Sequence, residues 1–347
     1  MTTGTVEETT GPQHPSPERM PGVPGPRARF AVTWGVALGL LLVAFVATII
    51  TLNSTVYSAS GFVSAYLQSL SRHDVASIVA MPGVVVDDDA DDALLRRDAL
   101  ARLSQVELVD DEDRGDGEHH VTFSYRVDGL PGQTTFAVQH TGARLGFFNA
   151  WEFIESPLTT LEVVPRNTVE FAVNGVHVVA TAGAGEVNPL QVLVPGAYSF
   201  SHESLYLEAE ETVLPVTSTE RVERFVLNVT ASDAFEDAVE KELAAYLDRC
   251  AEEEVLQPTG CPFGKEIANR VVSPPQWEVS DYPRVEIIPG EQIGTWIVPP
   301  AHGAARLDVD VMSLFDGSIA SFSEEVPFTV SYLVTFTADG GLTLTPR

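Results

Sequence analysis

The two cysteines are the most reactive side chains in this sequence of 347 residues. Cys250 stands at the end of an amphipathic stretch, and Cys261 follows a Pro-Thr-Gly turn. A zinc site needs about four ligands, and no histidine lies close to either cysteine in the sequence. A catalytic cysteine would need a neighbouring base. An even pair that closes a short loop is most simply a disulfide, provided that this part of the chain lies in an oxidising compartment.

Two acidic runs are the next candidates for chemistry. They are "DDDADD" (Asp87 to Asp92) and "DDEDRGDGE" (Asp110 to Glu118). Dense carboxylates can bind Ca²⁺ through six or more oxygens. Neither run has the spacing of a twelve-residue calcium loop, so the alternative is a solvated loop, the second run leading into a strand at Val121. The calcium candidates are Asp87, Asp89, Asp111 and Asp113.

The eight histidines are scattered, and two of them could share a surface. His119 alternates in phase with Val121, and His140 with Val138, so both could face one concave sheet together with Trp151. These three residues are the candidates for lining a ligand pocket, against the alternative of an ordinary core. The aromatic residues at 147, 148, 151 and 153 have strand spacing and favour core positions.

The sequence contains no set of residues typical of an active site. A glycine-rich phosphate loop, a serine elbow and a helical His-Glu metal motif are all missing from it. We therefore expect a protein that is not an enzyme, with no catalytic residue, no resident metal and no cofactor.

One segment predicts a membrane crossing. Phe30 to Leu52, "FAVTWGVALGLLLVAFVATIITL", has no ionisable residue. As a helix it would be about 34 Å long, against a hydrocarbon core of about 30 Å. The alternatives are a buried core helix, which would show a polar stripe, and a cleaved signal peptide, whose apolar region is usually shorter. We predict one transmembrane helix through the lipid bilayer.

Charges beside this helix predict its orientation. Arg27 and Arg29 directly precede it, and the next charged residue is Arg72, so the N terminus should be cytoplasmic. Residues 1–29, rich in Pro, Thr and Gly, are expected to form a disordered cytoplasmic tail. The rest of the chain would then be extracytoplasmic, in a single-pass protein of the cell membrane whose cysteines meet an oxidising exterior.

The net charge limits the partners. The chain has 49 acidic and 20 basic residues, a formal charge of -29, and all of this net charge lies after the apolar segment. Such a chain lacks the basic footprint that holds a phosphate backbone, which argues against nucleic acid. The expected partners are the bilayer, through Phe30 to Leu52, and an unidentified envelope protein or wall component.

The outer portion divides into three units by its periodicity. Residues 55–157 start with an amphipathic helix at Val56 to Leu70 and a shorter helix near Asp91 to Leu103, and then alternate as strands. Residues 160–220 form a small all-β unit, with hairpins expected at Asn174-Gly175 and Pro195-Gly196.

The third unit, residues 223–347, repeats the first plan. A helix capped by Ser232 or Asp233 leads to alternating strands and a last hairpin at Asp339 to Gly341. Ala245-Tyr246-Leu247 matches Ala65-Tyr66-Leu67 in the first unit, so the two units are either copies or two helices with similar faces.

A long helix, a short helix and a curved antiparallel sheet in about a hundred residues resembles the cone-shaped α+β fold of the nuclear transport factor 2-like group. The β unit, with "VNG" at Val173 to Gly175 and "VPGAYSF" at Val194 to Phe200, is similar to the middle domains of teicoplanin-resistance-associated membrane proteins. Those single-pass envelope proteins usually begin with a cytoplasmic zinc ribbon, whereas residues 1–29 contain no cysteine. The resemblance implies a domain order and no catalytic set.

The sequence thus predicts an α+β protein: a single transmembrane helix followed by two cone-like domains of helix plus antiparallel sheet, flanking a small all-β domain. The function we expect is binding or scaffolding by an acidic extracytoplasmic region. The alternatives are an envelope enzyme that uses a pocket in a cone domain, and a transmembrane sensor.

Overall fold

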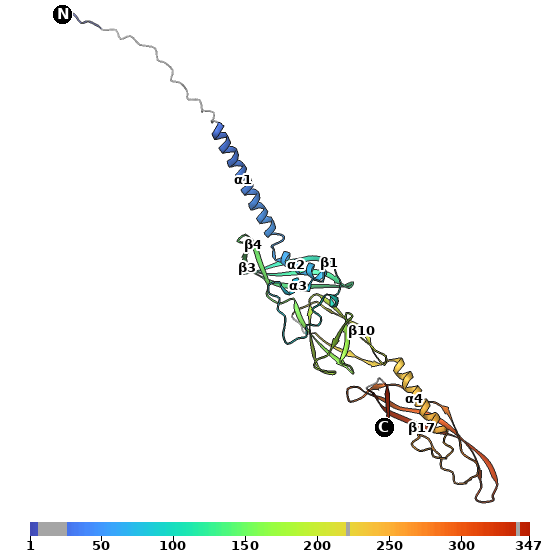
Figure 1. The fold of residues 1–347 in the computed structure, drawn as a ribbon. Coiled ribbons are helices and arrows are strands. Elements are labelled where there is room, and N and C mark those ends of the chain that lie inside the picture. Colours follow the sequence, from blue (N-terminus) through green and yellow to red (C-terminus); the bar gives the residue numbers. More distant parts are fainter. Residues whose placement is uncertain (6–25, 220–222, 338–340) are drawn as a thin grey trace. The chain divides into compact units, whose positions relative to one another are not determined.

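The computed structural model is an α+β fold that is mostly sheet (Figure 1). It describes the backbone of residues 1–5, 26–219, 223–337 and 341–347, with side chains except at 26–33 and 223. The chain separates into two compact units, Met1–Val56 and Tyr57–Arg347.

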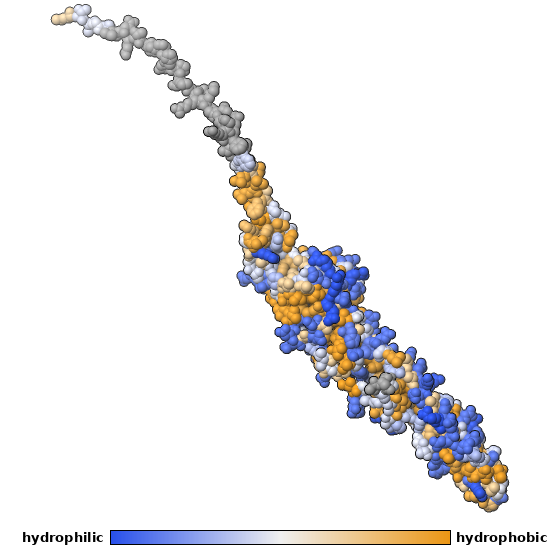
Figure 2. Space-filling view, viewed as in Figure 1, coloured by the Kyte–Doolittle hydropathy of each residue, from blue (hydrophilic) through white to orange (hydrophobic). Residues whose placement is uncertain are grey.

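The first unit contains one helix, α1 (Pro26–Asn53). Its stretch Trp34–Asn53 is long and apolar enough to cross a membrane, and none of its residues is buried within the protein. Most of the visible surface of α1 is hydrophobic (Figure 2). The sequence-based segment at Phe30 to Leu52 is therefore a candidate span, either a membrane anchor or a signal sequence. The expected tail lies mostly outside the described residues.

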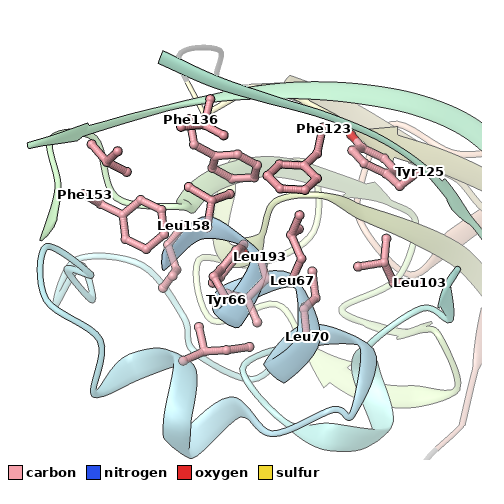
Figure 3. Close-up of a cluster of buried hydrophobic side chains, with 14 of the residues drawn as sticks. Tyr66, Leu67, Leu70, Leu103, Phe123, Tyr125, Phe136, Phe153, Leu158 and Leu193 are labelled. Atoms are coloured by element: carbon pink, nitrogen blue, oxygen red, sulfur yellow. The ribbon is translucent and has the colours of Figure 1, made fainter. Parts of the chain in front are cut away.

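The second unit begins with a helix on a four-stranded antiparallel sheet. Ser58 caps the helix, since its hydroxyl accepts a hydrogen bond from the Gly61 amide at 3.0 Å. Val63, Tyr66 and Leu67 are buried against the sheet, as the helical spacing predicts. Figure 3 shows Tyr66 and Leu67 below the aromatic side chains of the sheet. The elements are α2 (Ala59–Ser71), α3 (Val75–Val79), the 3₁₀ helix η1 (Arg97–Ala99), β1 (Leu103–Gly115), β2 (Glu118–Val127), β3 (Leu130–Arg144) and β4 (Phe148–Phe153), with strand order β1-β2-β3-β4.

The predicted helix near Asp91 to Leu103 is wrong, because only η1 is helical there. Asp91 forms a parallel bridge with Leu190 in the β-rich part of the unit, and its carboxylate accepts a hydrogen bond from the Ala93 amide at 2.8 Å. These bonds give the backbone an alternative to a helix.

The second acidic run is also not the loop that we predicted. Most of it belongs to β1, where Asp110 pairs with Thr122 and Asp113 with His119. Asp116 and Gly117 have positive φ angles of 52° and 83°, the geometry of a tight hairpin turn. β1 is an edge strand, and charged side chains on an exposed edge prevent further pairing.

Two further sheets, one of five strands and one of three, follow and enclose a second core. The strands are β5 (Leu158–Arg166), β6 (Glu170–Val173), β7 (Val176–Val179), β8 (Asn188–Leu193), β9 (Gly196–Glu203), β10 (Leu207–Val216), β11 (Glu223–Asn228) and β12 (Thr230–Ala231). One sheet has the order β12-β10-β9-β6-β7, and the other has the order β11-β5-β8. The β11–β5 pair is parallel, and the other pairs are antiparallel.

One of the two predicted hairpins forms. Asn174 and Gly175 have positive φ angles of 49° and 77° and connect β6 to β7. The hairpin predicted at Pro195-Gly196 is wrong, since β8 pairs with β5 while β9 pairs with β6 and β10. This turn connects two different sheets. The residues before and after it are nearly all buried, so the sequence shows no alternation of polar and apolar residues from which the change of sheet could be predicted.

Tyr66 connects the first core to the β sheets. Its hydroxyl donates a hydrogen bond to the buried carbonyl of Val194, and Leu193 packs in the same core (Figure 3). We predict that Tyr66→Phe lowers the free energy of unfolding by about 1–2 kcal/mol, because the buried carbonyl loses its partner. Urea unfolding would measure this loss, with Tyr57→Phe as the matched control. Equal effects of the two variants would contradict it.

The last part of the unit packs one helix against a long curved sheet. Ser232 caps the helix, as predicted, and Phe235, Val239 and Leu243 are buried along one stripe. The elements are α4 (Asp233–Ala251), β13 (Arg270–Val271), β14 (Gln276–Asp281), β15 (Ile288–Pro289), β16 (Thr295–Met312), β17 (Ile319–Phe336) and β18 (Leu342–Pro346). β16 is in contact with β13, β14, β15 and β17, and β18 pairs with β17.

The alternation predicted for the final strands is confirmed. Leu307, Val309 and Val311 are buried on β16, and Phe328 and Val330 are buried on β17. The pairing of β17 with β18 is antiparallel, as the last hairpin requires. Most of its turn, residues 338–340, lies outside the described residues.

Candidate functional site

The predicted disulfide is confirmed between Cys250 and Cys261. Cys250 lies in the last turn of α4 and is 3% exposed, so the bond ties the following loop to the buried face of the helix. The Trp277 indole donates to the Val255 carbonyl at 2.8 Å, and the Tyr246 hydroxyl donates to the Gly260 carbonyl. The loop is therefore fixed at both of its ends and in its middle.

This loop forms one wall of a pocket of about 480 Å³. α4 contributes Glu242, Tyr246 and Arg249, the disulfide loop contributes Gly260, and β17 contributes Tyr332. The opposite side is lined by β18 residues. In Figure 1 the C terminus, which directly follows β18, lies beside α4. The disulfide thus holds a pocket wall in place as well as closing a loop.

Tyr332 is the most informative residue of the pocket. It is 6% exposed, and its hydroxyl has no hydrogen-bond partner among the described residues. Burial raises the pKa of Tyr332 to about 12, and the nearby Tyr246 adds to this shift. The hydroxyl itself is not among the buried polar atoms that lack a partner, so it is accessible and can bond to a ligand group.

Two opposite charges lie on the α4 side of the pocket. Glu242 and Arg249 are separated by seven residues, or about two helical turns, and therefore share a helix face. Both are exposed, and within the described ranges neither forms an ion pair. The pocket therefore offers a carboxylate, a guanidinium cation and a tyrosine hydroxyl to a ligand.

The acidic candidates lie in two separate elements. Asp89 donates its amide to the Asp87 carboxylate at 3.0 Å, within a turn. Asp111 and Asp113 lie on β1, and Asp111 accepts a hydrogen bond from His119 at 2.7 Å. In the part of the chain that the structure describes, no three His, Cys, Asp or Glu side chains are grouped so that they could hold a metal ion.

The structure brings His119, His140 and Trp151 together. Both imidazoles meet the indole edge to face, with ring centroids 5.0 Å and 5.3 Å away. The indole N–H donates to the Tyr57 carbonyl at 2.9 Å, and Tyr57 stacks on Phe148. The cluster holds the first residues of the folded unit against the sheet, which is a structural role.

Phe147 is more exposed than the other aromatic residues of this segment. It is 55% exposed, in the turn between β3 and β4. Its strand-like spacing in the sequence was misleading because the turn interrupts the alternation.

Sequence reasoning missed the pocket between α4 and β18. The signals that could have indicated it are an acid and an arginine two turns apart on a helix that ends in a disulfide. They were weak, because nothing in the sequence places the last strand beside that helix. Comparisons of the chain with protein-family models, with curated proteins and with solved structures find no match.

Proposed function

We propose that this chain is a single-pass protein of the bacterial cell envelope, with a cytoplasmic N terminus and an acidic extracytoplasmic region that binds a ligand or partner. One observation carries the proposal: a disulfide lies in the folded unit that follows the apolar helix. Disulfides persist in oxidising compartments and are rare in the cytosol. The arginines before the helix support the same orientation.

The binding role rests on the pocket beside the disulfide. It combines charged, hydroxyl and apolar groups, and Tyr332 in it lacks a partner among the described residues. Ligand pockets typically have such a mixture of apolar lining and a few polar groups. Among the described residues that line the pocket, no nucleophile is paired with a base, which favours binding over catalysis.

Reporter fusions test the orientation. We expect alkaline phosphatase, which needs an oxidising compartment, to be active when it is fused after Arg347 of the full chain. A β-galactosidase fusion at the same place should be inactive. The full-length chain should also stay in the membrane after carbonate washing, which separates an anchor from a cleaved signal sequence. A cytosolic reporter that works after Arg347, or release of a shortened chain, would overturn the proposal.

We also propose that the two helix-and-sheet parts are copies of one cone-like α+β domain around the small all-β domain, with units at residues 55–157, 160–220 and 223–347. The sequence match of the two Ala-Tyr-Leu triplets superposes four buried positions of α2 on four of α4. The pairs are Ala59 with Val239, Val63 with Leu243, Leu67 with Leu247, and Leu70 with Cys250.

A further inference from the structure

We propose that the pocket between α4 and β18 binds a short extended peptide with free termini, which adds a strand to the sheet. This proposal names a ligand class for the binding role given above. It rests on that proposed function in one respect: the proposed orientation places the pocket, and therefore the peptide, outside the cytoplasmic membrane. The chemistry comes from the pocket itself.

The edge of β18 has the backbone groups that a new strand needs. Within the described ranges β18 pairs with β17 alone. Thr337 donates its amide to the Gly341 carbonyl at 2.9 Å, and Arg347 donates its amide to the Ser331 carbonyl at 3.0 Å. Hydrogen-bonded pairs alternate along an antiparallel ladder, so the odd-numbered residues of β18 bond to β17. The N–H and C=O groups of Leu342 and Leu344 therefore point away from β17.

The pocket follows this edge. Leu342, Thr343 and Leu344 all line it. Consecutive side chains of a strand point to opposite faces, so a pocket that touches three in a row meets the strand at its edge. Backbone pairing at an edge, with a helix as the other wall, is a recurring mode of peptide recognition.

The charges of α4 match the two ends of a short peptide. Arg249 can bind a carboxylate, and Glu242 can bind an ammonium group. Seven residues of helix rise about 10 Å, which is the length of about three residues in an extended chain. A tri- or tetrapeptide therefore fits the spacing. As a zwitterion it has no net charge, so the strongly acidic chain does not repel it.

Tyr332 and the leucines supply the remaining contacts. The Tyr332 hydroxyl has no partner in the described part of the protein and can donate a hydrogen bond to a peptide carbonyl. Leu342 and Leu344 are half-buried beside it and favour apolar side chains on the peptide.

The test is a titration of the full-length chain, in detergent micelles, with a pool of tetrapeptides built from alanine and leucine. NMR saturation transfer identifies the peptides that bind, and calorimetry then measures the Kd of the strongest one. We expect saturable binding that weakens about tenfold when the peptide's carboxylate is amidated, since a charge-assisted bond is lost. Arg249→Gln should weaken binding of the unmodified peptide by about the same factor. It should weaken binding of the amidated peptide by less than about twofold, because amidation and Arg249→Gln remove the same contact.

Matched variants separate this site from general effects on the fold. Arg284→Gln removes another exposed arginine of the same region, outside the pocket, and should leave the Kd within about twofold. Tyr332→Phe keeps the packed ring and should weaken binding about fivefold, whereas Tyr206→Phe should not. Glu242→Gln should weaken binding of the free peptide about fivefold. It should weaken binding of the N-acetylated peptide less than about twofold, because that peptide has no ammonium group for Glu242 to bind.

Three results would overturn the proposal: no saturable binding up to about 10 mM peptide, equal affinity for the free and amidated peptides, or equal effects of Arg249→Gln and Arg284→Gln. The reporter fusions decide the orientation separately. If the fusions give the expected topology and no peptide binds, only this inference is wrong. If peptides bind and the fusions give the opposite topology, only the proposed location is wrong.

Discussion

Phe235→Ala should lower the free energy of unfolding by about 3–5 kcal/mol, the largest loss that we expect from one substitution. Phe235 is fully buried at the start of α4. Its ring contacts Trp296, Phe336 and Tyr206, with centroids 5.2–5.8 Å away. Truncation removes these contacts and leaves a cavity, since a close-packed core relaxes only in part. Urea unfolding of the full chain, followed by tryptophan fluorescence, measures the loss.

Phe315→Ala is the control for this prediction. Phe315 is 100% exposed, so the same chemical change should alter stability by about 0.5 kcal/mol or less. Similar midpoints for the two variants would show that Phe235 is not at the centre of this core.

The second large effect concerns the disulfide. Cys250→Ala combined with Cys261→Ala should cost about 3 kcal/mol, because the bond closes a short loop and restricts the unfolded chain. Alanine is chosen because it adds no polar atom at the buried position 250. The double variant should also bind tetrapeptide more weakly, since Gly260 in the freed loop forms a wall of the pocket.

Reduction provides the control. A reducing agent should lower the stability of the wild-type chain by about the same amount and leave the alanine variant unchanged. An alanine variant as stable as the oxidised wild type would mean that hydrogen bonds alone hold the loop, such as the one from Trp277 to Val255.

Local patterns in the sequence predicted the two long helices, α2 and α4, and most strands of the second unit. The faces of α2 and α4 were visible from the spacing of their apolar residues, because one buried stripe repeats with the period of a helix. The alternation in β16 and β17 was visible for the equivalent reason. The Asn174-Gly175 turn was predicted from residues that tolerate positive φ.

The errors have a common physical origin. The acidic segment of β1 is a strand because β2 supplies its backbone partners, and side-chain composition does not reveal such pairing. The residues around Pro195-Gly196 are buried on both faces, so they show no alternation that would assign their strands to different sheets. The partner of β8 is remote in sequence, since it pairs with β5, whereas β1 pairs with β2, the next strand along the chain.

The sequence by itself determined the apolar segment, the acidic charge, the α+β class and the pairing of the only two cysteines. These features depend on composition and on short-range spacing, which a single chain displays directly. Only the tertiary structure decided that the last strand lies beside α4 and that the Tyr332 hydroxyl in the pocket between them lacks a partner in the described residues. That pocket arises from segments about a hundred residues apart, because the long curved sheet brings its edge back to the helix.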